Sequence, residues 1–280
     1  MAQGRSWRTW PTGADSGGAV SNSAMLEVSH LTKRYSGVTV VNDVSFVVRA
    51  GDIVGYLGPN GSGKTTTAKI ITGLLDSSSG TVRFAGGDIH DDLVGYRRRL
   101  GYVPEEPHLY PFLTGREYLE LVGRLRELEP ASLTAKITAL VELFGLGSAA
   151  DRNIASYSKG MKQKVLIIAA LVHDPDLVIL DEPDSGLDVT ASIVLRHLIR
   201  GLAAQGKAVL YSSHVMDSVE KLCSRVLVLH KGRVVADDSV ERLRGLRAGG
   251  SLEDVFSELV MREDPEQVAQ AIIGVLADHA

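Results

Sequence analysis

The chain has 280 residues, of which 44% are hydrophobic and 23% are charged, and its formal net charge is −4 at pH 7. This composition is typical of a globular protein and excludes collagen, a disulfide-rich mini-protein and a wholly disordered chain. The balance of charges gives no indication of a nucleic-acid-binding surface. The single cysteine, Cys223, cannot form an internal disulfide, which fits a reducing compartment.

The first 24 residues are rich in glycine, serine and alanine, and they contain both tryptophans, Trp7 and Trp10. They lack the apolar core of a secretory signal. Their composition predicts a disordered leader over residues 1–24, and the alternative is an upstream start that Met25 could replace. The longest apolar run, residues 165–172, has 8 residues. A membrane-spanning helix needs about 20 apolar residues, so we expect a soluble, intracellular chain.

Strand and helix signals alternate after the leader. Residues 25–84 are rich in strand signals, with one glycine-rich turn and one predicted helix in which Ile70, Ile71, Leu74 and Leu75 have helical spacing. Two amphipathic helices, in residues 116–128 and 132–146, have no strand signal between them and indicate a helical insertion over about 106–160. Apolar runs then return at residues 176–181, 208–213 and 225–230, separated by helices. This alternation predicts a parallel sheet with crossover helices.

Helical signals also dominate the C-terminal part. Ser251 and Asp254 have the spacing of a capping box, followed by an apolar stripe of Leu252, Val255, Phe256 and Leu259. Asp264-Pro265 predicts the start of another helix. We therefore expect a main domain over residues 25–245 and a C-terminal helical extension over residues 246–280.

The most specific motif is GPNGSGKT at residues 58–65, which matches the G-x-x-x-x-G-K-[ST] pattern of a phosphate-binding loop. Glycines let successive backbone N–H groups point at phosphate oxygens, Lys64 supplies a positive charge, and the Thr65 hydroxyl suits Mg²⁺. A chance glycine-rich turn would not explain why the motif follows a predicted strand and opens a predicted helix. The residues that we expect to contact the phosphates are Gly58, Pro59, Asn60, Gly61, Ser62, Gly63, Lys64, Thr65 and Thr66.

Two carboxylates end the apolar run LVILDE, which occupies residues 177–182. Asp181 is placed at the strand tip, where it can hold Mg²⁺ through water. Glu182 follows directly and can orient or deprotonate an attacking water molecule. The alternative is that these acids only keep the end of the strand soluble. The phosphate loop in the same chain favours the role at the metal and the water.

The segment YSKGMKQK, which begins at Tyr157, resembles the signature loop of ATP-binding-cassette (ABC) ATPases, L-S-G-G-Q. Ser158 and Gly160 match that core, whereas Tyr157, Lys159 and Met161 depart from it. Two further motifs follow in the family's order and make the resemblance specific.

Residues 185–188, SGLD, resemble the D-loop of that family, and His214 matches its switch histidine. Tyr35 matches the aromatic residue that stacks on adenine, with an ordinary strand aromatic as the alternative. Glu105 stands at the Q-loop position, where many members have glutamine, and a carboxylate there keeps the metal contact but changes its strength. The resemblance covers about residues 25–240.

The resemblance implies an α/β fold: a phosphate-loop NTPase core with a parallel sheet, an N-terminal antiparallel β-subdomain and an inserted α-helical subdomain. It implies ATP and Mg²⁺ as cofactors. It assigns catalysis to Lys64, Glu182 and His214, the metal to Thr65, Glu105 and Asp181, and further nucleotide contacts to Tyr35, Ser158, Gly160 and Asp188.

In this family two cassettes pair head to tail, so the resemblance implies a second ABC ATPase subunit whose signature loop covers the nucleotide. It also implies membrane permease subunits as partners, no nucleic acid, and a place in the cytoplasm on the inner face of the cell membrane. Tyr110, Pro111 and Phe112 are candidates for the permease contact, with ordinary packing as the alternative.

The segment YSKGMKQK, Glu105 after GYVP and the sequence LEDVF near the C-terminus resemble exporter-type cassettes. We therefore expect an ATPase subunit that powers export of an unknown substrate. Two alternatives remain within the family: an importer cassette, and a soluble ABC ATPase acting in translation or DNA repair, which usually has two cassettes or a long coiled coil. A nucleotide kinase with the same phosphate loop ranks last, because the other motifs have no role there.

Overall fold

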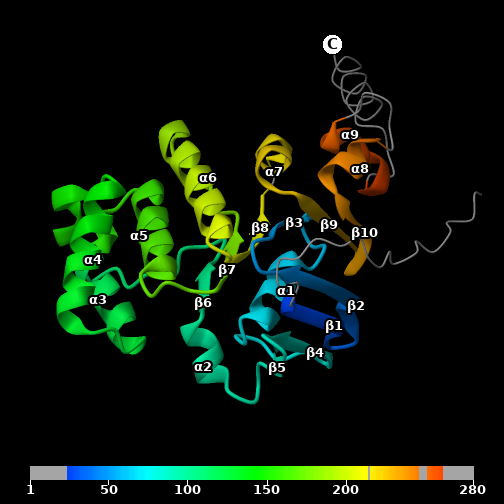
Figure 1. Cartoon of the computed structure of the whole chain (residues 1–280), viewed down its shortest axis with the longest axis horizontal. Coiled ribbons are helices and arrows are strands. Elements are labelled where there is room, and N and C mark those ends of the chain that lie inside the picture. The colour runs from blue at the N-terminus through cyan, green and yellow to red at the C-terminus, as the bar shows by residue number, and fades with distance from the viewer. Residues whose placement is uncertain (1–23, 214, 246–250, 261–280) are drawn as a thin grey trace, which may run out of the picture.

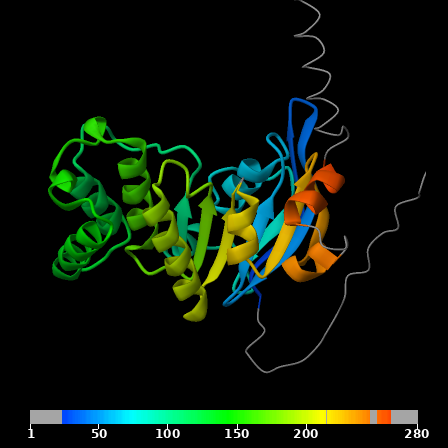
Figure 2. The same cartoon turned by 90° about the horizontal axis from the view of Figure 1, so that it is seen from above.

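The computed structural model describes residues 24–213, 215–245 and 251–260. Two sheets and a helical part make up the molecule (Figures 1 and 2). Three features expected from the sequence lie outside these residues: the leader up to residue 23, the switch residue His214, and the helix predicted from Asp264.

A four-stranded antiparallel sheet contains the N-terminal strands in the order β2-β1-β4-β5. Val44, Phe46 and Val48 of its second strand are buried and alternate with exposed or half-buried residues, whereas an extra residue at the irregularity around Asp43, which has φ +58°, separates them from the buried Val41. The strands of this sheet are β1 (Ala24–Tyr35), β2 (Val38–Arg49), β4 (Ser79–Phe84) and β5 (Gly87–Asp88).

A six-stranded sheet has the order β10-β9-β3-β8-β7-β6. Five of its strands are parallel, as the sequence predicted, whereas β10 pairs antiparallel with β9. A tight turn at Lys231 and Gly232, both with positive φ, joins these two strands, and so short a connection permits only an antiparallel pair. The strands are β3 (Ile53–Leu57), β6 (Leu100–Val103), β7 (Leu177–Asp181), β8 (Ala208–Ser212), β9 (Arg225–His230) and β10 (Arg233–Ser239).

The helix after the phosphate loop is shorter than the sequence predicted. It ends at Ile71, and Gly73 follows with φ +68°, a left-handed conformation that stops a helix. Leu74 consequently lies outside the helix and is 61% exposed, so its place in the predicted apolar stripe was wrong. The helices are α1 (Lys64–Ile71), α2 (Leu93–Arg98), α3 (Gly115–Leu125), α4 (Pro130–Leu143), α5 (Lys159–Leu171), α6 (Val189–Ala204), α7 (Met216–Leu222), α8 (Val240–Gly245), α9 (Leu252–Val260) and the short 3₁₀ helices η1 (Gly147–Asp151) and η2 (Ile154–Ser156).

Both faces of the six-stranded sheet are buried. Ile53 and Leu57 of β3 belong to a core shared with α5, α6, α7, α8 and α9 on one side. Val54 and Tyr56 of the same strand belong to a second core, formed with α1, α2 and the antiparallel sheet on the other side. Strands buried on both faces explain the continuous apolar runs in the sequence, because neither face meets water.

Helices α3, α4 and α5 enclose a third core with η1 and η2 (Figure 1). Helix α5 takes part in two cores, because it points Ile167 toward the sheet and Ile168 toward α3 and α4. Its N-terminal segment, which carries the signature-like sequence, is therefore fixed between the helical part and the sheet.

Helix α9 begins with the predicted capping box. The Ser251 hydroxyl accepts a hydrogen bond from the Asp254 backbone N–H, and the Asp254 carboxylate accepts one from the Ser251 N–H. The helix packs against α7 and α8, and the backbone N–H of Leu252 donates to the carboxylate of Glu220 in α7. The described helices include none that combines the length and the apolar character needed to span a membrane.

We expect the stability of the protein to depend on Ile168, which is fully buried in the third core. Replacing Ile168 with Ala should lower the free energy of unfolding by about 2–5 kcal/mol, because it leaves a cavity between α5 and the helices above it. Urea denaturation followed by circular dichroism measures this change.

The matched control is Leu125→Ala on α3, since Leu125 is 72% exposed. This change should alter the free energy of unfolding by less than about 0.5 kcal/mol. Equal losses for the two variants would contradict the described packing of α5.

Candidate functional site

The phosphate loop connects β3 to α1 and depends on two glycines with positive φ. Gly61 has φ +75° and Gly63, at the N-cap of α1, has φ +104°. A Cβ atom on Gly63 would lie 2.8 Å from the carbonyl oxygen of Val40, whereas one on Gly61 would meet nothing within 4 Å. Gly63 is thus required both by its backbone conformation and by the close approach of β2.

Lys64 folds back across the loop. Its Nζ donates to the carbonyl oxygen of Gly58 over 2.7 Å, and the side chain is buried. A Cβ atom on Gly58 would lie 2.4 Å from both the carbonyl oxygen of Leu229 and the hydroxyl of Ser62, so the loop is closely packed at this point. The Ser62 hydroxyl is buried and finds no hydrogen-bond partner among the described residues.

The two carboxylates expected at the strand tip lie where β7 ends. Asp181 is 3% exposed, and its Oδ1 accepts a 2.6 Å hydrogen bond from the hydroxyl of Ser212 at the end of β8. Burial raises the pKa of the Asp181 carboxyl, and the hydrogen bond from Ser212 opposes that rise. Glu182 follows with φ +50°, an uncommon conformation for a residue with a side chain, and its N–H points at the Ser212 hydroxyl and carbonyl.

The Thr65 hydroxyl reaches the third expected metal ligand and donates to Oε2 of Glu105 over 3.3 Å. The residues fit Mg²⁺, because they offer hydroxyl and carboxylate oxygens. Moreover, Oδ2 of Asp181 is buried without a hydrogen-bond partner among the described residues. Among the described residues, no three or more His, Cys, Asp or Glu side chains are grouped so that they could hold a metal ion by themselves.

A cavity of about 280 Å³ lies over the loop. It brings together residues of the phosphate loop with two carboxylates from segments 39 or more positions later in the chain. The lining residues are Val40, Asn60, Gly61, Ser62, Gly63, Lys64, Thr65, Thr66, Glu105 and Glu182. Sequence reasoning missed Val40, since an apolar residue in an alternating strand carries no signal of a ligand contact.

Tyr35 does not join this cavity and lies outside the set of described residues that line it. It ends β1, is 44% exposed, and has the Lys33 ammonium 5.1 Å from the centre of its ring. The expected stacking on adenine therefore remains a prediction about the loaded protein.

Three other expected residues form a separate group at the starts of two helices. Ser158 caps α5, with its hydroxyl accepting from the N–H of Met161, and Asp188 caps α6. Gly160 lies against the backbone of Gly186, since a Cβ atom there would be 2.5 Å from the Gly186 carbonyl oxygen. The signature-like and D-loop-like segments are therefore neighbours, and Ser158, Gly160 and Asp188 are not among the described residues that line the phosphate-loop cavity.

This arrangement combines the backbone N–H groups of the phosphate loop with the buried ammonium of Lys64. Beside them lie the oxygen atoms of Thr65, Glu105 and Asp181 and the further carboxylate of Glu182. The arrangement is suited to holding a polyphosphate chain, neutralising its charge and directing water at it. The positive charge of Lys64 and the carboxylates of Glu105 and Glu182 line the same cavity.

Comparisons with known proteins agree with this geometry. Residues 41–185 match the family described as ABC transporter. The chain is 35% identical over 243 residues to the ABC transporter ATP-binding protein NatA of Bacillus subtilis, a match that covers 85% of this chain and 99% of that protein. It is 37% identical over 233 residues to the Nod factor export ATP-binding protein I of Paraburkholderia xenovorans, covering 83% and 77% of the two chains.

Solved structures give the same result for the fold. The ATP-binding subunit of an ABC transporter superposes with a TM-score of 0.79 at 38% identity, covering 84% of this chain and 99% of that chain. The dimeric bacterial ABC transporter cassette MJ0796 superposes with a TM-score of 0.72 at 24% identity, covering 77% and 98%. The α/β fold with its antiparallel and helical parts is thereby confirmed.

The two loop glycines predict different effects of the same substitution. Gly61→Ala should cost about 1–2 kcal/mol of stability through its positive φ alone. Gly63→Ala should cost more and should weaken nucleotide binding at least tenfold, because the methyl group displaces the loop from Val40. Thermal unfolding and titration with a fluorescent ATP analogue measure both effects, and equal behaviour of the two variants would contradict the described loop.

Proposed function

The chain belongs to the ABC transporter family, and we propose that it is the ATPase subunit of an exporter with separate membrane permease subunits. Membership of the family makes it an ATP-binding cassette that hydrolyses ATP. The observation that carries the proposal is the cavity in which the phosphate loop meets Glu105 and Glu182. We assign the ATPase domain to residues 25–245 and a C-terminal extension to residues 246–280.

Binding of the nucleotide is assigned to the loop from Gly58 to Thr66. Its N–H groups, together with those at the N-terminus of α1, would donate hydrogen bonds to the phosphate oxygens. The Lys64 ammonium, which donates to the Gly58 carbonyl, would move to a phosphate oxygen. Thr65, Glu105 and Asp181 are the ligands that we assign to Mg²⁺, which would neutralise charge on the phosphates when bound. Tyr35 is assigned to the adenine, on the resemblance alone.

Catalysis is assigned to Glu182, which would accept a proton from the attacking water or orient that water. The Ser212 contacts to Asp181 and to the Glu182 backbone keep the two carboxylates in fixed relation. His214, outside the described residues, is assigned the γ-phosphate contact on the resemblance alone.

A head-to-tail pair of cassettes is supported by the separation of the site into two groups. Ser158 and Gly160 begin α5 on a part of the surface outside the phosphate-loop cavity, so they would act on the nucleotide of a second subunit. The Ser158 hydroxyl and the N-terminus of α5 suit a γ-phosphate. Asp188, next to them, would reach across the same interface.

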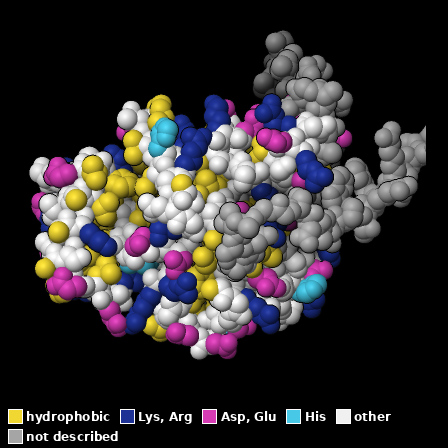
Figure 3. Space-filling view, viewed as in Figure 1, with side chains coloured by type: hydrophobic (Ala, Val, Ile, Leu, Met, Phe, Trp, Pro, Cys, Tyr) yellow, Lys and Arg dark blue, Asp and Glu magenta, His cyan; other side chains and the backbone are white. Residues whose placement is uncertain are grey.

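Contact with a permease is assigned to the helical part. Tyr110 is 53% exposed and Phe112 is 70% exposed, and Figure 3 shows hydrophobic side chains gathered over the helical part of the molecule. Exposed apolar clusters of this kind mark contact surfaces. We therefore place the subunit on the inner face of the cell membrane, bound there through its partner.

The direction of transport is inferred from sequence features. The segment YSKGMKQK, the carboxylate at Glu105 and the sequence LEDVF are typical of exporter cassettes. One relative is named for Nod factor export, which supports the same direction here without indicating the substrate.

The dimer proposal predicts the behaviour of Glu182→Gln. This variant should bind ATP without hydrolysing it, so that saturating Mg-ATP converts it from monomer to dimer in size-exclusion chromatography with light scattering. The control is the double variant with Lys64→Ala, which should stay monomeric because it binds phosphate poorly. A monomeric Glu182→Gln profile under saturating Mg-ATP would count against the proposed pairing.

The transport proposal predicts association with a hydrophobic partner from the same cells. The tagged chain, purified in mild detergent, should retain a multi-span membrane protein, and Phe112→Glu should release it while leaving ATP binding unchanged.

Co-purification with ribosomes or DNA repair proteins instead would overturn the assignment. Uptake rather than efflux in vesicles containing both subunits would reverse the proposed direction.

A further inference from the structure

The segment that joins the site carboxylates to α6, residues 182–188, is held by three side chains from other elements, one of which is Ser212 at the Glu182 N–H. Gln163 of α5 is 1% exposed and donates from Nε2 to the carbonyl oxygen of Pro183 over 3.0 Å. Tyr211 of β8 is fully buried and donates its hydroxyl to Oδ2 of Asp184. The segment is thereby linked both to the helix with the signature-like sequence and to the central sheet.

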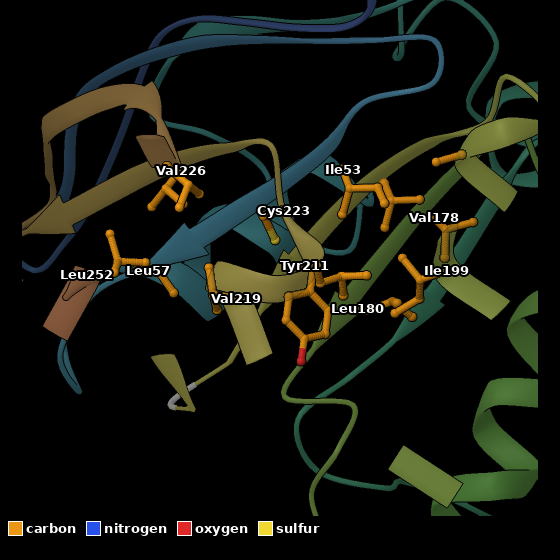
Figure 4. Close-up of a cluster of buried hydrophobic side chains, with 14 of the residues drawn as sticks. Ile53, Leu57, Val178, Leu180, Ile199, Tyr211, Val219, Cys223, Val226 and Leu252 are labelled. Carbon is orange, nitrogen blue, oxygen red and sulfur yellow. The ribbon is translucent and has the colours of Figure 1, made fainter. Parts of the chain in front are cut away.

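Strand β8 brings its last two residues to two different acids. Leu180 pairs with Tyr211, and Asp181 pairs with Ser212. Ser212 holds the Asp181 carboxylate at the strand tip, while Tyr211 reaches Asp184 three residues further on. Figure 4 shows the Tyr211 ring within the apolar cluster, with its hydroxyl pointing out of that cluster.

The tyrosine is a fixed donor. Burial raises the pKa of the Tyr211 hydroxyl further above its usual value, and the charge of Asp184 raises it more, so the hydroxyl keeps its proton at every physiological pH. The ring packs in a core with residues such as Val178 and Ile199, which leaves it little freedom to move.

The acceptor, Asp184, lies in a segment with few hydrogen bonds between its own residues. Two turn hydrogen bonds stabilise it, from Ser185 N–H to the Glu182 carbonyl and from Leu187 N–H to the Asp184 carbonyl. Gly186 adds a left-handed turn at φ +82°. Oδ1 of Asp184 is buried and has no hydrogen-bond partner among the described residues, so the tyrosine hydroxyl is the donor that holds this carboxylate.

We infer that Tyr211 and Asp184 are positioning residues, which fix segment 182–188 so that Glu182 faces the nucleotide at one end and Asp188 faces the interface at the other. Without the hydroxyl, the Asp184 carboxylate would turn toward water and the adjacent backbone would follow it. The inference rests on the catalytic role proposed above for Glu182. It concerns the geometry of hydrolysis and is independent of the direction of transport.

The test is Tyr211→Phe, which removes one hydroxyl and keeps the ring. We expect kcat for ATP hydrolysis to fall roughly tenfold, the usual effect of losing one hydrogen bond to a charged group. The KM for ATP and the affinity for a fluorescent ATP analogue should change less than about twofold, because the phosphate loop is untouched.

The matched control is Tyr96→Phe. Tyr96 is also buried, and it donates its hydroxyl to the backbone carbonyl of Ile71 in α1 rather than to segment 182–188. It should lose a similar amount of thermal stability with kcat unchanged. If both variants lose stability and neither loses kcat, Tyr211 is only a core residue and the inference is wrong.

A double-mutant cycle tests whether the pair acts as a unit. Asp184→Ala should lower kcat as much as Tyr211→Phe does, and the double variant should be no slower than either single variant. Asp184→Asn keeps an acceptor oxygen for the tyrosine and should retain kcat within about threefold of the wild type. Additive losses in the double variant would overturn the inference. If Tyr211→Phe does not fold, Asp184→Ala and Asp184→Asn carry the test, because this side chain is only half-buried.

Glu182→Gln separates this inference from the proposed function. If Glu182→Gln hydrolyses ATP at the wild-type rate, the catalytic role of Glu182 is wrong and the inference falls with it. If Glu182→Gln is inactive and Tyr211→Phe is fully active, the positioning role alone is wrong.

Discussion

Burial of the six-stranded sheet on both faces is the constraint on which the site depends. Apolar side chains on each side of β3, β7 and β8 prevent any of these strands from shifting without exposing a core to water. The strands are parallel neighbours, so their carboxyl ends meet at one edge. The phosphate loop leaves β3 there, Asp181 ends β7 and Ser212 ends β8.

The edge of the sheet therefore supplies a rigid base, while the loops above it supply the polar groups. Helix α5 packs in two cores and connects the sheet to Ser158 and Gly160, which lie outside the cavity. Gln163 connects that helix to Pro183, next to the site carboxylates. The signature-like segment and the carboxylates of one chain are thus linked by a direct hydrogen bond between their elements.

Sequence patterns identified most of the fold because each pattern reflects burial that is local to its element. Continuous apolar runs predicted β7, β8 and β9, and amphipathic spacing predicted α3 and α4. The errors arose at the end of a helix and at an edge strand of the sheet. Gly73 ends α1 before Leu74, and the edge strand β10, whose residues are all exposed or half-buried, gave no clear signal.

By itself, the sequence determined the chemistry that is contained in short segments: the phosphate loop, the acids after an apolar run, and the capping box at Ser251. These follow from spacing over a few residues, which backbone geometry fixes. The tertiary structure alone decided which further segments meet, such as Asp181 with Ser212, 31 residues apart, and Tyr211 with Asp184, 27 residues apart. Such contacts depend on the order of strands in the sheet, and the periodicity of hydrophobic residues shows which face is buried but not which strand lies beside it.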